Sequence, residues 1–334
     1  MAKQYRIVRK IATVNIVAGG FASYDLPRDY DYEAIGFRIS GSVQVSVSNE
    51  TSVRAEAPCQ WIPRVEIIAD GKNNLCSVPF WALSLGRYDT DLPQSGARGT
   101  TPPTSPNVGT YAVEALGVYD FASIDGVRPK DSNFRSRGLS LFQVRFTFGN
   151  PVDIFVHAAA TVAFSGTPTV DIYAVQLVEE QDAQGNYATT PIALKKMSYQ
   201  QLAVPSTNAN QELRLPAGNM IRSVFIRTEG AVTAGEPATG TLNNLILQNG
   251  VDVRFNLQAS NVRALDNARY GQLIAGYYVA DMMSARGGYG NLTLSDLWDL
   301  TAYAEPKAVM DITGATNAVV YAVTTEYILA NPSA

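Results

Sequence analysis

The sequence has little of what enzymes and nucleic-acid-binding proteins use most. Of its 334 residues, one is histidine and two are cysteine, and charged residues make up only 17%. Metal-dependent enzymes built from two β-barrels need several histidines and a carboxylate, so one histidine excludes that class. The net charge of −4 excludes a dedicated nucleic-acid binder with a strongly basic domain.

Nucleophilic catalysis also lacks its residues. A Ser-His-Asp arrangement would have to use His157, and no Gly-x-Ser-x-Gly turn occurs. The glycine-rich stretch 287–290 lacks the lysine of a phosphate-binding loop, and we interpret it as a plain loop. Acids at 29–33 and at Glu179-Glu180 would serve acid–base or cation chemistry only in a special geometry, so we interpret them as solvated turns. We predict no enzymatic activity and no cofactor, and leave a structural calcium ion open.

The two cysteines, Cys59 and Cys76, do not have Cys-x-x-Cys spacing. They cannot form a metal site alone, and a disulfide between them stays open. The chain has no uninterrupted apolar run of about 18 residues, which a membrane-spanning helix would need. Polar and charged residues interrupt the N-terminal segment, so we expect no secretion signal and synthesis in a cytoplasm.

Positive charge gathers at the N-terminus. Lys3, Arg6, Arg9 and Lys10 all precede the first acidic residue, Asp25. Terminal segments tend to be loose, so one interpretation is a solvated arm. The other is a basic arm pointed at something anionic, such as lipid headgroups or a packaged genome. The sequence leaves both open.

What the sequence does contain is alternation of apolar and polar residues. The segments 43–47, 142–148 and 251–257 alternate strictly, which is typical of strands with one buried face. The dipeptides Asp70-Gly71 and Asn249-Gly250 are typical of tight hairpin turns. We therefore predict an all-β protein of antiparallel strands.

Helical patterns are few. We predict short helices only near 79–85 and at 294–303, where Ser295 is a candidate cap. His157 follows an alternating run, and we place it at the end of a strand. Trp61, Trp81 and Trp298 are scattered through the chain rather than clustered, so we expect them to pack in a core or an interface.

The chain also repeats itself, in four blocks that occur in the same order in both halves. Spacing is constant within a block and changes between blocks, as loops of different length between shared strands would produce. The matches are Leu26-Pro27 and Phe37-Arg38 with Leu215-Pro216 and Ile226-Arg227, Asp70-Gly71 with Asn249-Gly250, Ala82-Leu83 with Ala264-Leu265, and Tyr173-Ala174-Val175 with Tyr321-Ala322-Val323.

This duplication predicts two β-sandwich domains. We place the first at 1–180, with a proline-rich surface insertion at 90–110, and a linker plus the second at 181–334. About eight strands per half with loops of unequal length favour two tandem eight-stranded jelly rolls over up-and-down barrels. One large sandwich with a long polar loop is the alternative.

The residues that open each half carry a resemblance to a known family. These are Asn15 to Pro27 and Ala34 to Gly41 in the first half, and Leu215 to Arg227 in the second. In pattern and order they resemble the double jelly-roll major capsid proteins of icosahedral viruses. The resemblance is greatest to the corticovirus type, the coat proteins of tailless bacteriophages with an internal membrane.

The resemblance implies a structural protein of the virion. Such a coat protein forms a homotrimer in which six rolls surround a pseudo-sixfold axis, and trimer–trimer contacts tile an icosahedral capsid. It would meet other capsid proteins such as a vertex protein, with the 90–110 insertion outward and the basic arm towards internal membrane lipids or the genome.

Two other functions fit a duplicated sandwich. A tandem carbohydrate-binding or adhesin protein is the main alternative. A glycan-cleaving enzyme comes after it, because it would need two carboxylates facing each other across a groove.

Overall fold

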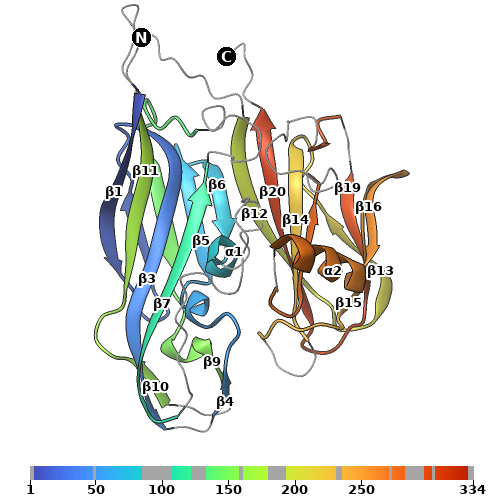
Figure 1. The fold of residues 1–334 in the computed structure, drawn as a ribbon, viewed down its shortest axis with the longest axis horizontal. Coiled ribbons are helices and arrows are strands. Elements are labelled where there is room, and N and C mark those ends of the chain that lie inside the picture. Colours follow the sequence, from blue (N-terminus) through green and yellow to red (C-terminus); the bar gives the residue numbers. More distant parts are fainter. Residues whose placement is uncertain are drawn as a thin grey trace, which may run out of the picture.

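The structure is a computed structural model that places two sandwiches of strands side by side (Figure 1). It describes residues 4–47, 50–84, 107–121, 133–157, 161–179, 193–230, 235–270, 273–282, 297–302 and 305–329. Most of the predicted insertion and the linker after Glu179 lie outside these ranges. The predicted domain boundary therefore stays a prediction.

The first roll packs two antiparallel sheets face to face. One sheet has the order β1 (Gln4–Asn15), β11 (Thr169–Glu179), β3 (Asp31–Val47) and β7 (Gly109–Asp120). The other has the order β2 (Phe21–Asp25), β8 (Phe142–Thr147), β5 (Arg64–Ala69) and β6 (Asn73–Val78). Smaller elements complete the roll: β10 (Thr161–Phe164) on β3, the pair β4 (Glu50–Val53) and β9 (Phe155–His157), the 3-10 helices η1 (Ala57–Trp61) and η3 (Pro151–Ile154), and α1 (Phe80–Ser84).

The second roll is built in the same way. Its first sheet has the order β12 (Ala193–Ala203), β20 (Val319–Leu329), β14 (Met220–Thr228) and β17 (Tyr277–Asp281), with β18 (Trp298–Asp299) also on β14. Its second sheet has the order β13 (Asn208–Arg214), β19 (Pro306–Ile312), β15 (Leu242–Asn249) and β16 (Asp252–Gln258). The helix α2 (Ala259–Tyr270) joins β16 to β17.

Both rolls have one strand order. We number the eight main strands of each roll along the chain and leave out the small strands β4, β9, β10 and β18. Strands one, eight, three and six then form one sheet, and strands two, seven, four and five form the other. This is the jelly-roll order, so the predicted fold class is confirmed. The matched blocks of the sequence fall on matching elements: the third strands β3 and β14, the turns after β5 and β15, the helices α1 and α2, and the eighth strands β11 and β20.

Pairing between strands also joins the rolls. The fifth strand of the first roll, β6, lies parallel to the first strand of the second roll, β12, with Cys76 opposite Met197. The second sheet of one roll thereby continues into the first sheet of the other, as a nine-stranded sheet.

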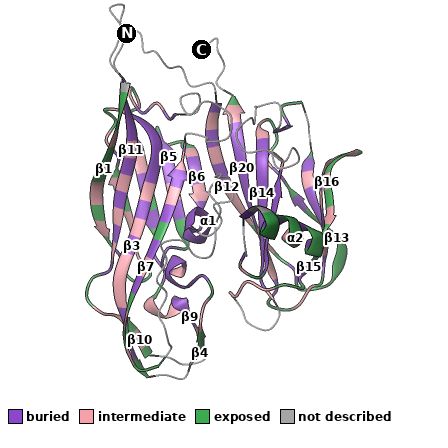
Figure 2. Cartoon of the chain, in the orientation of Figure 1, coloured by how far each residue is buried: buried purple, intermediate pink, exposed green. Residues whose placement is uncertain are grey.

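The buried residues form two main clusters. One is the interior of the second roll and contains Leu245 and Trp298. The other fills the first roll and extends across to Phe225 and Tyr277 of the second. Figure 2 shows burial running through the strands of both rolls and the boundary between them. All three tryptophans are buried, in agreement with the packing role expected of them.

Three local predictions are wrong. The helix expected at 294–303 is absent from residues 297–302, because Trp298 and Asp299 pair with β14 as a short strand. The acids Asp31 and Glu33 lie buried at the start of β3 rather than in a solvated turn. The helix α2 was not expected. The short helix near Pro79 and the placing of His157 at a strand end are confirmed.

Candidate assembly surfaces

The N-terminal basic segment is a strand rather than a loose arm. Lys3 lies outside the described residues, but Arg6, Arg9 and Lys10 belong to β1, which pairs with β11 from Gln4 to Asn15. The apolar residues between the charges give this segment the alternation of a strand, and the sheet holds it. The expectation of a free arm is therefore wrong for these residues.

Each of these cations has a polar partner within the roll, and carboxylates partly neutralise the charges of Arg6 and Lys10. Whether they also contact lipid or a genome stays a prediction. Arg6 Nε lies 2.5 Å from Glu33 Oε2, Lys10 Nζ lies 2.6 Å from Asp171 Oδ1, and Arg9 Nε donates to Gln176 Oε1 over 2.9 Å.

Other candidate chemistry is sparse in the described part of the chain. It holds no group of three or more His, Cys, Asp and Glu side chains that could bind a metal ion. Cys59 and Cys76 are both free and buried. Burial raises the pKa of Asp31, while Arg137 and Arg135, with Nε atoms 3.7 and 3.9 Å from its oxygens, act in the opposite direction. No helix in these ranges has the length and apolar character to cross a bilayer.

A buried ion pair fastens the two rolls together. Arg227 of β14 donates from Nε to Glu56 Oε1 over 2.7 Å and from Nη2 to Oε2 over 2.8 Å. Both residues are almost fully buried, and Glu56 belongs to the first roll. Tyr277 of β17 donates a further hydrogen bond to Glu56. Burial alone would lower the pKa of Arg227, but the Glu56 carboxylate raises it above its ordinary value.

Aromatic rings surround this pair. Trp81 of α1 reaches across from the first roll and packs on Phe225 and Tyr277, with ring centroids 5.6 and 6.0 Å apart. The Arg227 guanidinium lies over the rings of Trp81 and Tyr321, at 5.5 and 4.8 Å. Bidentate arginine pairs and stacked arginines are geometrically demanding contacts. We call this contact the seam.

The seam covers one face of the second roll with α1 and Glu56 of the first. On the second roll, the helix at the same place in the strand order, α2, is largely exposed (Figure 2). Its Leu265 is 41% exposed, whereas every residue of α1 is buried. The corresponding outer face of the first roll is open as well, and Leu116 of β7 is 40% exposed there.

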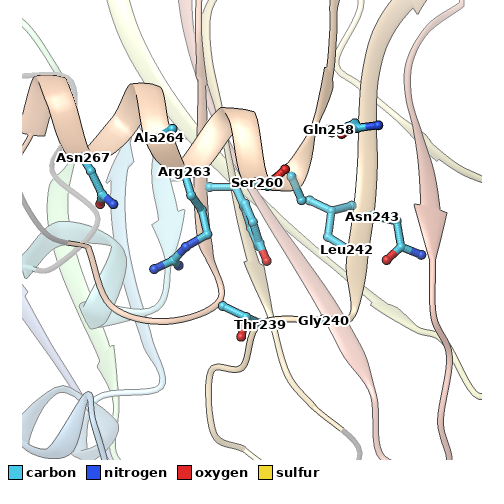
Figure 3. Close-up of a pocket in the computed structure, with 11 residues that line it drawn as sticks. Thr239, Gly240, Leu242, Asn243, Gln258, Ser260, Arg263, Ala264 and Asn267 are labelled. Atoms are coloured by element: carbon cyan, nitrogen blue, oxygen red, sulfur yellow. The ribbon is translucent and has the colours of Figure 1, made fainter.

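A recess of about 680 Å³ lies beside α2, between the helix and the loop that precedes β15. Figure 3 shows Arg263 and Asn267 projecting from α2 and Thr239 at the loop. Polar and apolar groups both line it, and Arg263 supplies a positive charge. Sequence reasoning identified neither this recess nor the seam, because both depend on residues that are far apart in the chain.

Comparison with protein-family models and with curated protein sequences finds no match. Solved structures do match over nearly the whole chain. The major capsid protein of Sulfolobus turreted icosahedral virus has a TM-score of 0.71 at 16% identity, with 97% of both chains covered. The major capsid protein of bacteriophage PM2 has a TM-score of 0.57 at 15% identity, covering 98% of this chain and 99% of that one. The PBCV-1 virus capsid has a TM-score of 0.62 at 13% identity, covering 98% and 94%. The chain therefore has the double jelly-roll fold of these viral major capsid proteins.

Proposed function

We propose that this chain is the major capsid protein of an icosahedral virus and that it assembles as a homotrimer. Three chains bring six rolls around a pseudo-sixfold axis, and the trimers tile the shell of the virion. One observation carries the proposal: the seam joins two rolls of identical strand order through two different surfaces. Repeating such a head-to-tail contact produces a ring when the rotation closes.

The proposed role is structural. It assigns no enzymatic activity and no cofactor, and leaves structural calcium between trimers to test. Among the described residues, no three or more His, Cys, Asp and Glu side chains are grouped so that they could bind a metal ion. Its partners are further copies of the chain, a vertex protein, and lipid or genome beside the β1 cations.

The trimer is tested by size-exclusion chromatography with light scattering on the purified chain. The expected mass is three times the chain mass of 36.0 kDa. Negative-stain electron microscopy should show pseudo-hexagonal particles. A clean monomer that persists at high protein concentration would contradict the proposal.

A further inference from the structure

The seam is formed by the α1 side of the first roll and the sheet face around Arg227 of the second roll. Because the two rolls repeat one fold, each of these surfaces has a counterpart on the other roll that takes no part in the seam. We propose that the outer face of the first roll, centred on Arg38, Glu114, Leu116 and Tyr173, docks on α2 and its recess in a second copy of the chain. We call these the Arg38 face and the α2 face. The inference rests on the trimer proposed above and names the surfaces that form it.

The Arg38 face corresponds to the seam on the third and sixth strands of the roll. Arg38 of β3 occupies the place of Arg227 of β14 in the repeat, and the residues opposite them on the sixth strands are Leu116 and Tyr277. In the seam, Tyr277 is fully buried by the first roll, whereas Leu116 is exposed. The second roll's face is thus covered within the chain, and the first roll's face lacks the same cover.

A contact with Glu114 fixes the position of the Arg38 side chain, which stays accessible on this face. Its Nε lies 2.6 Å from Glu114 Oε1, yet its side chain is 43% exposed. The hydrogen bond with Glu114, and a second with the Tyr173 hydroxyl, raise the pKa of Arg38. In the seam, by contrast, the carboxylate that takes the bidentate contact comes from the other roll, since Glu56 lies across the boundary.

The α2 face is the unused copy of the other seam surface. In the first roll, α1 carries Trp81 into the seam, and all five of its residues are buried. In the second roll, α2 stands between the same strands and exposes Leu265, and its Arg263 and Asn267 line the recess of about 680 Å³. Arg263 lies in that recess, where it donates a hydrogen bond to the backbone oxygen of Ile274 over 3.2 Å.

The free strand edges agree with this pairing. The seam joins a fifth strand, β6, to a first strand, β12. The unused fifth strand, β16, and the unused first strand, β1, are both at the ends of their sheets. Every chain therefore has one fifth strand, β16, and one first strand, β1, with an outer edge that is unpaired within the described residues. In a ring of copies, β16 of one chain faces β1 of the next chain. The occupant of the Arg38 face is a second copy of this chain.

A charge placed on the Arg38 face tests the contact. Leu116→Lys should keep the fold, since the side chain is already partly in solvent, and should raise the concentration at which the trimer dissociates by about tenfold or more. Val17→Lys is the matched control, because Val17 is exposed in the turn between β1 and β2, outside the Arg38 face. Circular dichroism checks that both variants fold, and mass photometry over a dilution series measures the trimer.

Cross-linking tests the same contact without relying on that variant. The chain with both Leu116→Cys and Leu265→Cys should give cross-linked trimers with a short bismaleimide, because its native cysteines are buried. Chains with either substitution alone should give none. A trimer that survives Leu116→Lys and gives no cross-links from the double variant overturns this inference and leaves the capsid proposal standing. A wild-type chain that stays monomeric overturns both.

Discussion

Arg227 of the second roll and Glu56 of the first form a two-point ion pair in the seam, although 171 residues separate them in the sequence. Two charges taken out of water are tolerated only when they are well paired. The pair therefore fixes where the second roll sits on the first, in addition to any free energy it contributes. The relation between the rolls is specified by a contact that fails if either partner is lost.

Glu56→Gln should destabilise the chain strongly. A buried charge left with no partner costs about 3–5 kcal/mol, and the loss should be somewhat smaller here because Arg227 keeps Glu229 as a carboxylate partner. Urea unfolding at fixed protein concentration measures the loss. Glu236→Gln is the control, because Glu236 pairs with Arg54 over 3.3 Å nearer the surface and should cost at most about 1 kcal/mol. Equal losses in the two variants would contradict the role given to Glu56.

Glu114 should make the stability depend on pH through Arg38. The hydrogen bond from Arg38 lowers the pKa of Glu114 below its ordinary value of 4.5. A carboxyl with a lowered pKa in the folded state stabilises the fold above the unfolded pKa, and this contribution disappears as the pH falls through the folded pKa. Because the pair is exposed, the contribution is at most about 1 kcal/mol.

Arg38→Gln tests this linkage. The substitution should raise the pKa of Glu114 towards 4.5, as followed by NMR titration of its carboxyl carbon, and should flatten the acid limb of the stability curve. Arg145→Gln removes the same charge elsewhere and should leave Glu114 unchanged. An unaltered Glu114 titration in Arg38→Gln would show that the pair is not formed in solution.

The two thiols should be inert in the folded chain. Burial raises the pKa of Cys59 and of Cys76, so both stay protonated. The thiolate is the reactive form, and a protonated thiol does not react. Ellman's reagent at pH 8 should label neither until denaturant is added, and then should label both. The Val17→Cys chain serves as the positive control, with one fast thiol, because Val17 is exposed and lies outside the Arg38 face. Fast labelling of a native thiol would mean that its surroundings open in solution.

Two phenylalanines of the first roll should differ widely in their effect on stability. Phe37 is fully buried and packs edge-on against Phe146, with ring centroids 5.5 Å apart, whereas Phe21 is 84% exposed. Phe37→Ala should cost about 3–5 kcal/mol, and Phe21→Ala about 0.5 kcal/mol or less. Chemical unfolding of both variants checks the difference. A similar cost for both would mean that Phe21 is covered in the assembled protein.

The fold was predictable because the same local pattern occurs twice. Hairpin turns such as Asp70-Gly71 have left-handed backbone angles, φ 51° and 67°, that few residue types adopt readily. Such turns and the alternating strands between them are local properties that sequence reveals. The same patterns recur in the same order in both halves, as in the match of Phe37-Arg38 with Ile226-Arg227, and this recurrence indicated two copies of one fold.

The assembly surfaces were not predictable, because their contacts are distant in sequence or interrupt the expected pattern. The helix α2 buries Ala259, Val262, Asp266 and Tyr270. A carboxylate on the buried face breaks the apolar periodicity, and Asp266 is there because it accepts a hydrogen bond from the backbone N–H of Val279. The segment 294–303 misled in the opposite direction, since Trp298 and Asp299, expected in a helix, pair with β14.

The parallel pairing of β6 with β12 has a mechanical consequence. The rolls are joined in two ways, by the β6–β12 pairing at Cys76 and Met197 and by the Arg227–Glu56 ion pair, so hinging one roll against the other would strain both contacts. The two rolls of a chain should therefore move as one rigid body. Any curvature of a shell made from it must then arise at the joints between chains.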